Sequence, residues 1–199
     1  MKIIGAVIAG GKSLRMGGDE KAFLHLAGKG ILDLVVGRFE PQVDQLVINA
    51  NGDAARFSEF ELDVVSDVLT NLKTPLAGLH AALNFTAKNG GDILVTCPSD
   101  TPFLPIDIST QLIAAVQSSG AAIAASGEQQ HYIIGAWKVG LLDDLEKAIS
   151  RDGLFRVKDW CKHVSAPVVH WPRTPFDPFF NVNTREDLSE AELIVRTHS

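Results

Sequence analysis

The chain is poor in cysteine and in basic residues, which excludes several classes of function. Cys97 and Cys161 are its only cysteines; they form no CxxC pair and have no histidine at metal-ligand spacing, so we expect buried, reduced thiols. The 24 acidic residues outnumber the 18 basic ones, and no Lys/Arg-rich arm appears, which argues against nucleic acid as a partner. A net charge of −6 still permits an anion to bind, provided that loop amides and a few cations hold it locally.

Long apolar runs are also lacking. None approaches the ~20 residues of a membrane span, and the first strand-like run, Lys2 to Ala9, is too short for a signal peptide. We therefore expect a cytoplasmic protein without a membrane partner. Hydrophobic residues make up 46% of the chain and charged residues 21%, which is typical of a globular rather than a disordered protein. No repeat or linker divides the chain, so residues 1–199 are predicted to form a single domain.

Short β-rich runs alternate with helical patterns along the whole chain. The predicted strands are Ile3–Ala9, Leu46–Asn49, Val64–Ser66, Ile93–Cys97, Ala121–Ala125, Tyr132–Trp137 and Pro167–His170. The predicted helices are Ile31–Phe39, Leu76–Ala87, Ser109–Ser118, Leu141–Ile149, Leu154–Lys162 and Arg185–Val195. This alternation predicts an α/β fold with a mostly parallel central sheet. Ligands of such sheets bind beyond the carboxyl ends of the strands, so the loops that follow the strands matter most.

The loop after the first predicted strand combines glycines with cations. Four glycines within nine residues let its backbone turn sharply and present amides to anionic oxygens: Gly10, Gly11, Gly17 and Gly18. Lys12, Arg15 and Lys21 add enough positive charge to match much of a triphosphate. The loop is not a Walker A motif, because Ala6 stands where that motif requires glycine, and Lys12 likewise breaks the dinucleotide pattern GxGxxG. It therefore predicts a phosphate-binding loop of another kind.

Carboxylates follow two later strands. Val64–Ser66 runs into Asp67, and Ile93–Cys97 runs into Pro98-Ser99-Asp100, so both aspartates are expected at the carboxyl edge of the sheet. Magnesium prefers one or two carboxylates together with phosphate oxygens and water. Asp100 lies between Pro98 and Pro102, which stiffen the backbone of a ligand-holding turn. The alternative is that each aspartate only caps a turn or a helix.

Amides and a glycine mark three further loops. Asn49 either forms an Asx-type turn or binds a base or ribose, and Gly78, in the first turn of a helix, allows close approach. Asn181 and Asn183 would share one face of an extended segment, with Val182 packed inward. Asn183 is alternatively a cap of the last helix, for which Thr184 and Asp187 also form a capping pair. His131 is the one histidine expected to face the site.

Taken in order, these motifs resemble the molybdenum cofactor guanylyltransferase family. The resemblance rests on Ile8-Ala9-Gly10-Gly11, Arg15-Met16-Gly17-Gly18, Lys21, Asn49-Ala50-Asn51, Asp67, Pro75-Leu76-Ala77-Gly78, Cys97-Pro98-Ser99-Asp100 and Asn181-Val182-Asn183-Thr184. It implies a Rossmann-like, three-layer nucleotidyltransferase domain. Such an enzyme would join GMP from GTP to the terminal phosphate of molybdopterin carrying molybdenum, and would release pyrophosphate.

The resemblance also implies residue roles. GTP would be bound by Ile8, Ala9, Gly10, Lys21, Asn49, Asp67 and Asp100, to which we add Gly11 and Gly78. Asp100 would hold Mg²⁺, the expected cofactor, and Asn181 and Asn183 would line the pterin side. Arg15 and Lys21 would supply positive charge to the transferring phosphates, so they join Asp100 as predicted catalytic residues. Other molybdenum cofactor biosynthesis proteins and chaperones of apo-molybdoenzymes are possible partners.

Two residues depart from the family pattern, and other interpretations remain open. Glu20 stands where the family has aspartate, and Tyr132 where proline often follows the equivalent of His131. A sister nucleotidyltransferase would use CTP or a sugar-phosphate acceptor, although cytidylyl relatives tend to carry alanine at Gly10. A GTP-binding accessory protein is disfavoured by the missing glycine at position 6. A non-catalytic interaction module would leave the aligned acids and cations unexplained.

Overall fold

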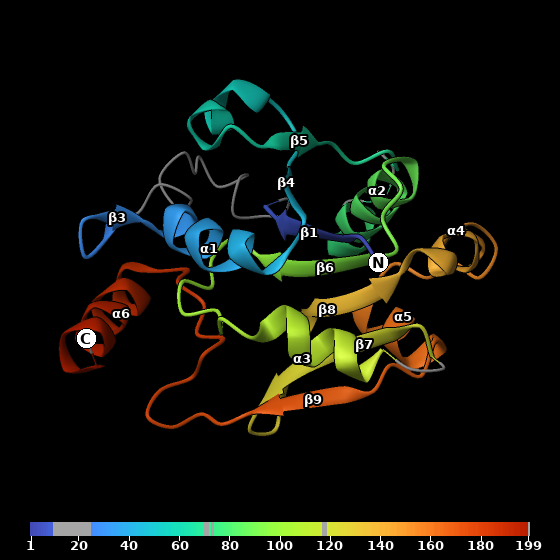
Figure 1. The fold of residues 1–199 in the computed structure, drawn as a ribbon. Coiled ribbons are helices and arrows are strands. Elements are labelled where there is room, and N and C mark those ends of the chain that lie inside the picture. The colour runs from blue at the N-terminus through green and yellow to red at the C-terminus, as the bar shows by residue number, and fades with distance from the viewer. Residues whose placement is uncertain (10–24, 70–71, 73, 117–118, 199) are drawn as a thin grey trace.

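A computed structural model describes residues 1–9, 25–69, 72, 74–116 and 119–198 of the chain. Its main sheet has seven strands in the order β5-β4-β1-β6-β8-β7-β9 (Figure 1). In chain order they are β1 (Ile3–Ile8), β4 (Gln45–Asn49), β5 (Asp63–Val65), β6 (Ile93–Pro98), β7 (Ala121–Ser126), β8 (Gln129–Lys138) and β9 (Val168–Trp171). Neighbouring strands pair in parallel, except where β8 pairs with β6 and β7. The prediction of a mostly parallel central sheet is confirmed.

The central strands are apolar and buried on both faces. β1 and β6, which read IIGAVI and ILVTCP, are buried along nearly their whole lengths. Such continuous apolar runs are typical of parallel strands that helices cover on either side. β8 differs because it follows β7 directly through a tight turn and runs back along β6. Its start therefore lies at the edge where the parallel strands end.

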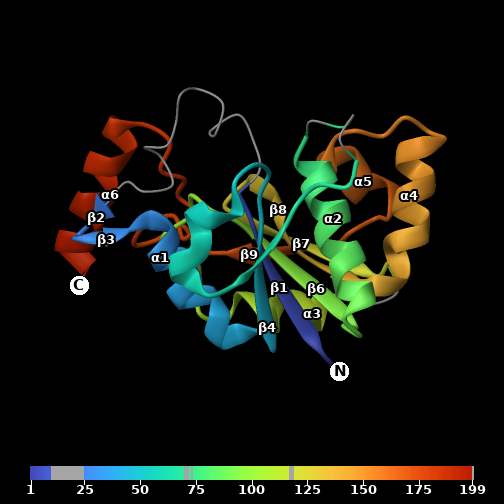
Figure 2. The same ribbon diagram turned by 90° about the horizontal axis from the view of Figure 1, so that it is seen from above.

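Helices cover both faces and give the three predicted layers (Figure 2). One apolar cluster joins α1 (Ile31–Phe39) and α3 (Ile108–Ala115) to the sheet, and a second joins α2 (Pro75–Lys88), α4 (Leu142–Ser150) and α5 (Val157–His163) to the opposite face. Short 3-10 helices span Glu40–Gln42, Ala54–Phe60 and Val139–Leu141. No helix among these described parts of the chain is both long and apolar enough to span a bilayer.

The last helix, α6 (Arg185–His198), lies apart from these layers. It packs against a small hairpin of β2 (His25–Leu26) and β3 (Lys29–Gly30), where a third apolar cluster contains Leu26, Val182 and Ala191. This hairpin was not predicted, because two-residue strands are too short to show a hydrophobic period. All seven main strands lie where they were predicted, although β8 begins three residues earlier, at Gln129.

Candidate functional site

Four strands end level with one another and define the carboxyl edge of the sheet. Ile8, the last residue of β1, is in register with Asn49 of β4 and with Pro98 of β6, and Asn49 is in register with Val65 of β5. The ladder continues one step further, because Ala9 N donates to Asn49 O over 2.8 Å. The loops that carry the predicted site residues therefore start side by side.

A hydrogen-bonded network links the loops after β4 and β5. Asn49 Nδ2 donates to Val65 O and to Asp67 Oδ1, each over 3.0 Å. Asn51 Nδ2 donates to Asp67 Oδ2 over 2.7 Å, and Asn51 Oδ1 accepts from Asp67 N over 3.0 Å. Asn51 was not among the predicted site residues, although it stands in the quoted Asn49-Ala50-Asn51 motif. The carboxylate of Asp67 is thus held through both of its oxygens.

The first turn of α2 packs directly against this network. Pro75 begins the helix, and Gly78 lies so close to Asn49 that an added Cβ would collide with Asn49 Oδ1 and come within 3.3 Å of Ile8 Cγ2. The close approach predicted for Gly78 is therefore observed, and the group that approaches it is a side chain of the protein. This close packing brings the N-terminus of α2 to the carboxyl edge of the sheet. The unpaired amides of a helix N-terminus favour anions.

Asp100 and Asn181 are brought together at the end of β6. The backbone O of Asp100 accepts from Val182 N over 2.9 Å, and Thr101 Oγ1, which is buried, donates to Asn181 Oδ1 over 3.0 Å. Asp100 itself is half-buried. The predicted metal ligand and a predicted acceptor residue therefore lie side by side. No pattern in the sequence marks Thr101, because its partner comes from the other end of the chain.

Burial alternates along the segment around Asn181, which has no assigned strand or helix. Val182 is buried between an exposed Asn181 and a half-buried Asn183. Thr184 Oγ1 accepts from Asp187 N over 3.1 Å, and Asp187 Oδ2 accepts from the backbone N of Asn183 and of Thr184 over 2.8 Å. The predicted Thr184–Asp187 capping pair is confirmed. The alternative that Asn183 caps the helix is wrong, because the threonine hydroxyl takes that role.

His131 faces the segment that leads to Asn181. Its Nε2 lies 2.9 Å from Ser126 Oγ, and its ring centroid lies 4.8 Å from that of Phe179. Burial lowers the pKa of His131, and nearby Arg173 adds to that effect while Asp177 opposes it. The neutral imidazole is therefore favoured. Tyr132 packs on the opposite face of the sheet, in the apolar cluster of α2, α4 and α5, with its ring centroid 5.8 Å from Lys158 Nζ. Phe179 belongs to the cluster on the other face, so the residue that departs from the family pattern points away from it.

Both cysteines are free and buried, as predicted. Burial, and after it the negative charge of Asp100, raises the pKa of Cys97 well above its ordinary value. Burial raises the pKa of Cys161 to about 12. The thiols are therefore protonated at neutral pH, and neither is a candidate nucleophile.

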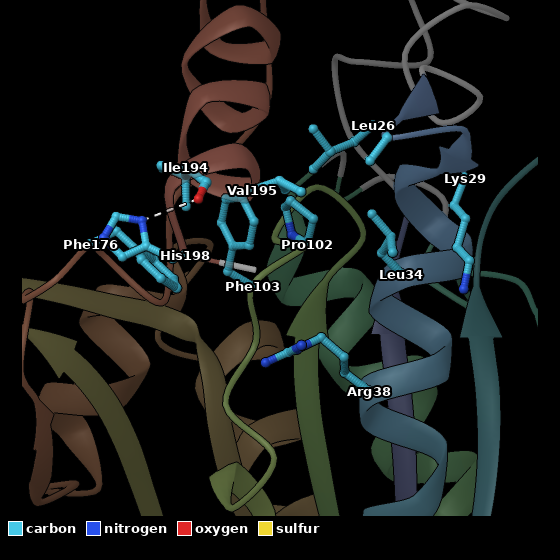
Figure 3. Close-up of a pocket in the computed structure, with 11 residues that line it drawn as sticks. Leu26, Lys29, Leu34, Arg38, Pro102, Phe103, Phe176, Ile194, Val195 and His198 are labelled. Carbon is cyan, nitrogen blue, oxygen red and sulfur yellow. Dashed lines mark hydrogen bonds between the residues drawn. The ribbon is translucent and has the colours of Figure 1, made fainter.

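A cavity of about 410 Å³ lies next to this site, between α1, α6 and the loop after β6 (Figure 3). Pro102 and Phe103, which closely follow Asp100 in the chain, form part of its wall together with Phe176 and His198. The rings of Phe103 and Phe176 are 5.2 Å apart, and the ring of His198 meets Phe176 edge-on at 5.3 Å. The cavity is mainly apolar and aromatic, with Lys29 and Arg38 at its border.

The predicted phosphate-binding loop lies outside the described residues. This applies to Gly10, Gly11, Lys12, Arg15, Glu20 and Lys21, so only Ile8 and Ala9 of that motif have a described position. Across the described ranges, no three His, Cys, Asp or Glu side chains form a group that would hold a metal by themselves.

Aligned strand ends, a carboxylate after each of two strands and a helix N-terminus between them are typical of nucleotide-binding α/β proteins. Comparison with known proteins narrows this class. A family model described as the MobA-like NTP transferase domain matches residues 5–166. A protein of Nitrobacter hamburgensis named molybdenum cofactor guanylyltransferase is 42% identical over 194 residues, which cover 96% of this chain and 93% of that protein.

Two further comparisons agree. A protein of the same name from Rhodopseudomonas palustris is 41% identical over 192 residues, covering 94% of this chain and 91% of that protein. The crystal structure of molybdopterin-guanine dinucleotide biosynthesis protein A from Archaeoglobus fulgidus superposes with a TM-score of 0.71 at 25% identity, covering 99% of this chain and all of that one. The chain therefore belongs to the MobA-like NTP transferases and, within them, to the molybdenum cofactor guanylyltransferase family.

Proposed function

We propose that the protein transfers GMP from GTP to the terminal phosphate of molybdenum-loaded molybdopterin, forming the molybdopterin guanine dinucleotide cofactor and pyrophosphate. The observation that carries the proposal is the position of Asn181, fastened through Thr101 beside Asp100. On the other side of Asp100, at the same carboxyl edge, lie the Asn49–Asp67 network and the start of α2. Two phosphorylated substrates that approached from these two sides would meet at Asp100. Family membership supports the identity of both substrates.

The chemistry needs positioning and charge neutralisation more than proton transfer. An oxygen of the acceptor phosphate attacks the α-phosphorus of GTP and forms a new P–O bond. The bond from that phosphorus to the oxygen bridging to the β-phosphate breaks, and its electron pair leaves with pyrophosphate. The acceptor phosphate is largely dianionic near pH 7, because its second pKa is about 6, so no strong general base is required. The residues must instead align two anions and offset their repulsion.

The nucleotide is proposed to bind along the ends of β1, β4 and β5. Its ligands would be Ile8, Ala9, Asn49, Asp67 and Gly78, together with Gly10, Gly11 and Lys21 of the loop beyond β1. Arg15 and Lys21 would neutralise the phosphates that are being separated. Support comes from the N-terminus of α2, which Gly78 brings against Ile8 and Asn49. Such a helix end favours phosphate groups.

Mg²⁺ is proposed as the cofactor, with Asp100 as its protein ligand. The donor set fits, because magnesium usually takes one or two carboxylates and completes its shell with phosphate oxygens and water. Asp100 is half-buried at the end of β6, and its backbone is held by Val182. When bound, the ion neutralises phosphate charge and helps the leaving pyrophosphate. Asp100 would hold it at the point where both substrates converge.

The acceptor is proposed to bind on the side of Asn181 and Asn183. An amide presents paired donor and acceptor groups, which match the mixed hydrogen-bonding edge of a pterin. We further propose that the protein works in the cytoplasm. There, other molybdenum cofactor biosynthesis proteins would supply its acceptor, and chaperones of apo-molybdoenzymes would receive its product.

Product analysis tests the proposal. The protein is incubated with Mg²⁺, molybdenum-loaded molybdopterin and either GTP or CTP, and the products are identified by mass spectrometry. We expect a GMP adduct of the acceptor and an equal amount of pyrophosphate, with little adduct from CTP. A CMP adduct would instead assign the chain to a cytidylyltransferase. Release of orthophosphate from GTP without acceptor would indicate a GTPase.

A further inference from the structure

The cavity between α1 and α6 takes no part in the proposed transfer. Its volume of about 410 Å³ lies within the range of about 300–1,000 Å³ that is usual for pockets that hold small organic molecules. Five parts of the fold line it: the β2–β3 hairpin, α1, the loop after β6, the segment after β9, and α6 (Figure 3). It runs from the loop that follows Asp100 toward the far ends of α1 and α6, where Arg38 and His198 lie.

Aromatic rings form much of the wall of this cavity. The rings of Phe103 and Phe176 are inclined at 57° to each other, and the ring of His198 meets Phe176 at 66°. Both phenylalanines are half-buried, so part of each ring is accessible from the cavity. Leu34 and Val195 add aliphatic surface. Such a wall favours a planar aromatic ligand, because aromatic rings attract one another when they meet tilted or edge-on.

The charge of the cavity points to an anion. Among the described residues that line it there is no aspartate or glutamate, whereas Lys29 and Arg38 are both present. This is unusual for the chain, in which 24 acidic residues outnumber 18 basic ones. Arg38 Nε donates to Leu104 O over 2.6 Å, which holds the guanidinium beside the loop after β6. That bond does not engage the Nη groups, whose planar fork matches a carboxylate or phosphate through two parallel hydrogen bonds.

We infer that this cavity is a second ligand site, which takes a small planar aromatic anion, a ring system with one carboxylate or phosphate group. The ring lies against Phe103 and Phe176, and the anionic group pairs with the fork of Arg38, while Lys29 adds positive charge at the border. The binding part of this inference goes beyond the proposed function and does not depend on it.

The wall of the cavity also connects it to the acceptor side. Phe103 follows Thr101, which donates to Asn181, and its ring centroid lies 6.5 Å from that of Phe180, next to Asn181 in the chain. Phe103 and Phe180 pack on the same apolar cluster as Val182. A ligand that fixes Phe103 therefore acts first on the segment proposed to bind the acceptor. The Asn49–Asp67 network lies across the sheet, at the ends of β4 and β5, and is left alone.

Binding is tested with two probes of the same shape, 2-naphthoate and the uncharged 2-naphthalenemethanol, titrated into the full chain by calorimetry without any substrate. We expect one saturable site for naphthoate and weaker binding of the alcohol. Arg38→Gln should weaken naphthoate about tenfold, which is within the range for a lost hydrogen bond to a charged group, and leave the alcohol unchanged. Arg196→Gln, an exposed arginine of α6 outside the lining, is the matched control and should change nothing.

Phe176→Leu provides a second variant, because it removes one ring of the wall without touching the cation. It should weaken both probes by the same factor. The inference is overturned if naphthoate shows no saturable binding, if the two probes bind equally well, or if Arg38→Gln leaves the naphthoate affinity unchanged.

The connection to the acceptor side is tested by steady-state kinetics of GMP transfer. Saturating naphthoate should shift the KM for the acceptor several-fold and leave that for GTP unchanged, and the Arg38→Gln variant should lose this response at the same naphthoate concentration. An unaltered KM for the acceptor, or an equal shift in both values, would overturn the connection. This arm rests on the proposed function. If the wild-type protein transfers no GMP, that function fails, and the calorimetric result still decides whether the cavity binds an aromatic anion.

Discussion

The proposed nucleotide side of the site is built from adjacent strands, whereas the proposed acceptor side depends on a segment that lies far along the chain. β5, β4, β1 and β6 are all parallel, and side chains that follow β4 and β5 are hydrogen-bonded to one another. Asn181 instead lies between β9 and α6, in a stretch without strand or helix. It is fastened by Thr101, by the backbone of Asp100 and by the packing of Phe179.

This difference indicates how each side keeps its shape. Backbone ladders fix the nucleotide side, because strand register alone places Asn49 next to Ile8 and Val65. Side-chain contacts fix the acceptor side: Phe179 packs against His131 and edge-on against Trp171, with centroids 4.8 and 5.4 Å apart. The ion pair between Arg173 and Asp177 adds little to the stability of this segment, because the arginine is largely exposed. Such surface pairs contribute about 0–1 kcal/mol. We expect the acceptor side to be the easier one to disturb without unfolding the protein.

The largest effect is expected where the two sides meet. Asp100→Asn keeps the size of the side chain but removes the charge proposed to hold Mg²⁺, and should raise the barrier to transfer by several kcal/mol, on the order of a hundredfold or more in rate. Initial rates measured across a range of Mg²⁺ concentrations check this. Asp92→Asn, at the opposite end of β6, is the control. Near-normal turnover at low Mg²⁺ would reduce Asp100 to a turn residue.

Phe179→Leu should separate the two sides by loosening only one. It removes the ring that packs on His131 and Trp171 but keeps an apolar side chain in the core, so the free energy of unfolding should fall by about 1–1.5 kcal/mol. The KM for the acceptor should rise several-fold while that for GTP stays the same, as steady-state kinetics with each substrate varied would show. An equal rise in both values would mean that the two sides are not independently held.

Thr184→Ala should weaken the attachment of the acceptor segment to α6. The hydroxyl that accepts from Asp187 N would be lost, at a cost of about 1 kcal/mol in the free energy of unfolding. Urea denaturation measures this value. Asn183→Ala should cost less, since only the backbone of Asn183 contributes to the cap. The reverse order would restore the capping role that the sequence suggested for Asn183.

The smallest expected effect concerns pH. The folded protein lowers the pKa of His131, chiefly by burial, so the folded state binds this proton less readily than the unfolded chain does. Its stabilising contribution is therefore fully present above the ordinary histidine pKa of about 6.5 and declines as pH falls below that value. Melting temperatures at pH 7.5 and pH 5.5, for wild type and for His131→Gln, should show a smaller acid loss in the variant. An unchanged acid loss would show that His131 does not carry it.

The order of strands along the sequence was enough to predict which residues lie at the carboxyl edge of the sheet. Asn49 ends an apolar run, and Asp67 and Asp100 each follow one within three residues, so the rule that ligands gather at carboxyl ends was enough to assign them to one edge. The capping pair of Thr184 and Asp187 was equally accessible, because a helix cap is a local pattern.

Contacts between distant parts of the chain were not predictable in this way. Thr101 meets Asn181, and His131 meets Phe179, only after folding, and nothing near either residue in the sequence marks the partner. The burial of Asn49 was also hidden, since a motif shows that an amide stands at a strand end but not which way its two hydrogens point. The sequence thus predicted which residues meet at the carboxyl edge, but not which of their atoms bond to the protein itself.

The division into two sides can be measured most directly by titrating GTP and molybdenum-loaded molybdopterin separately against the double variant Asn181→Ala, Asn183→Ala. Val182 stays in place between the two positions, and the cap at Thr184 is retained, so the segment should keep its path. We predict an unchanged Kd for GTP together with acceptor binding that is weaker by about tenfold or more, the loss expected for a few hydrogen bonds. Reduced GTP affinity with normal acceptor affinity would contradict the account, because Asn181 would then belong to the nucleotide side.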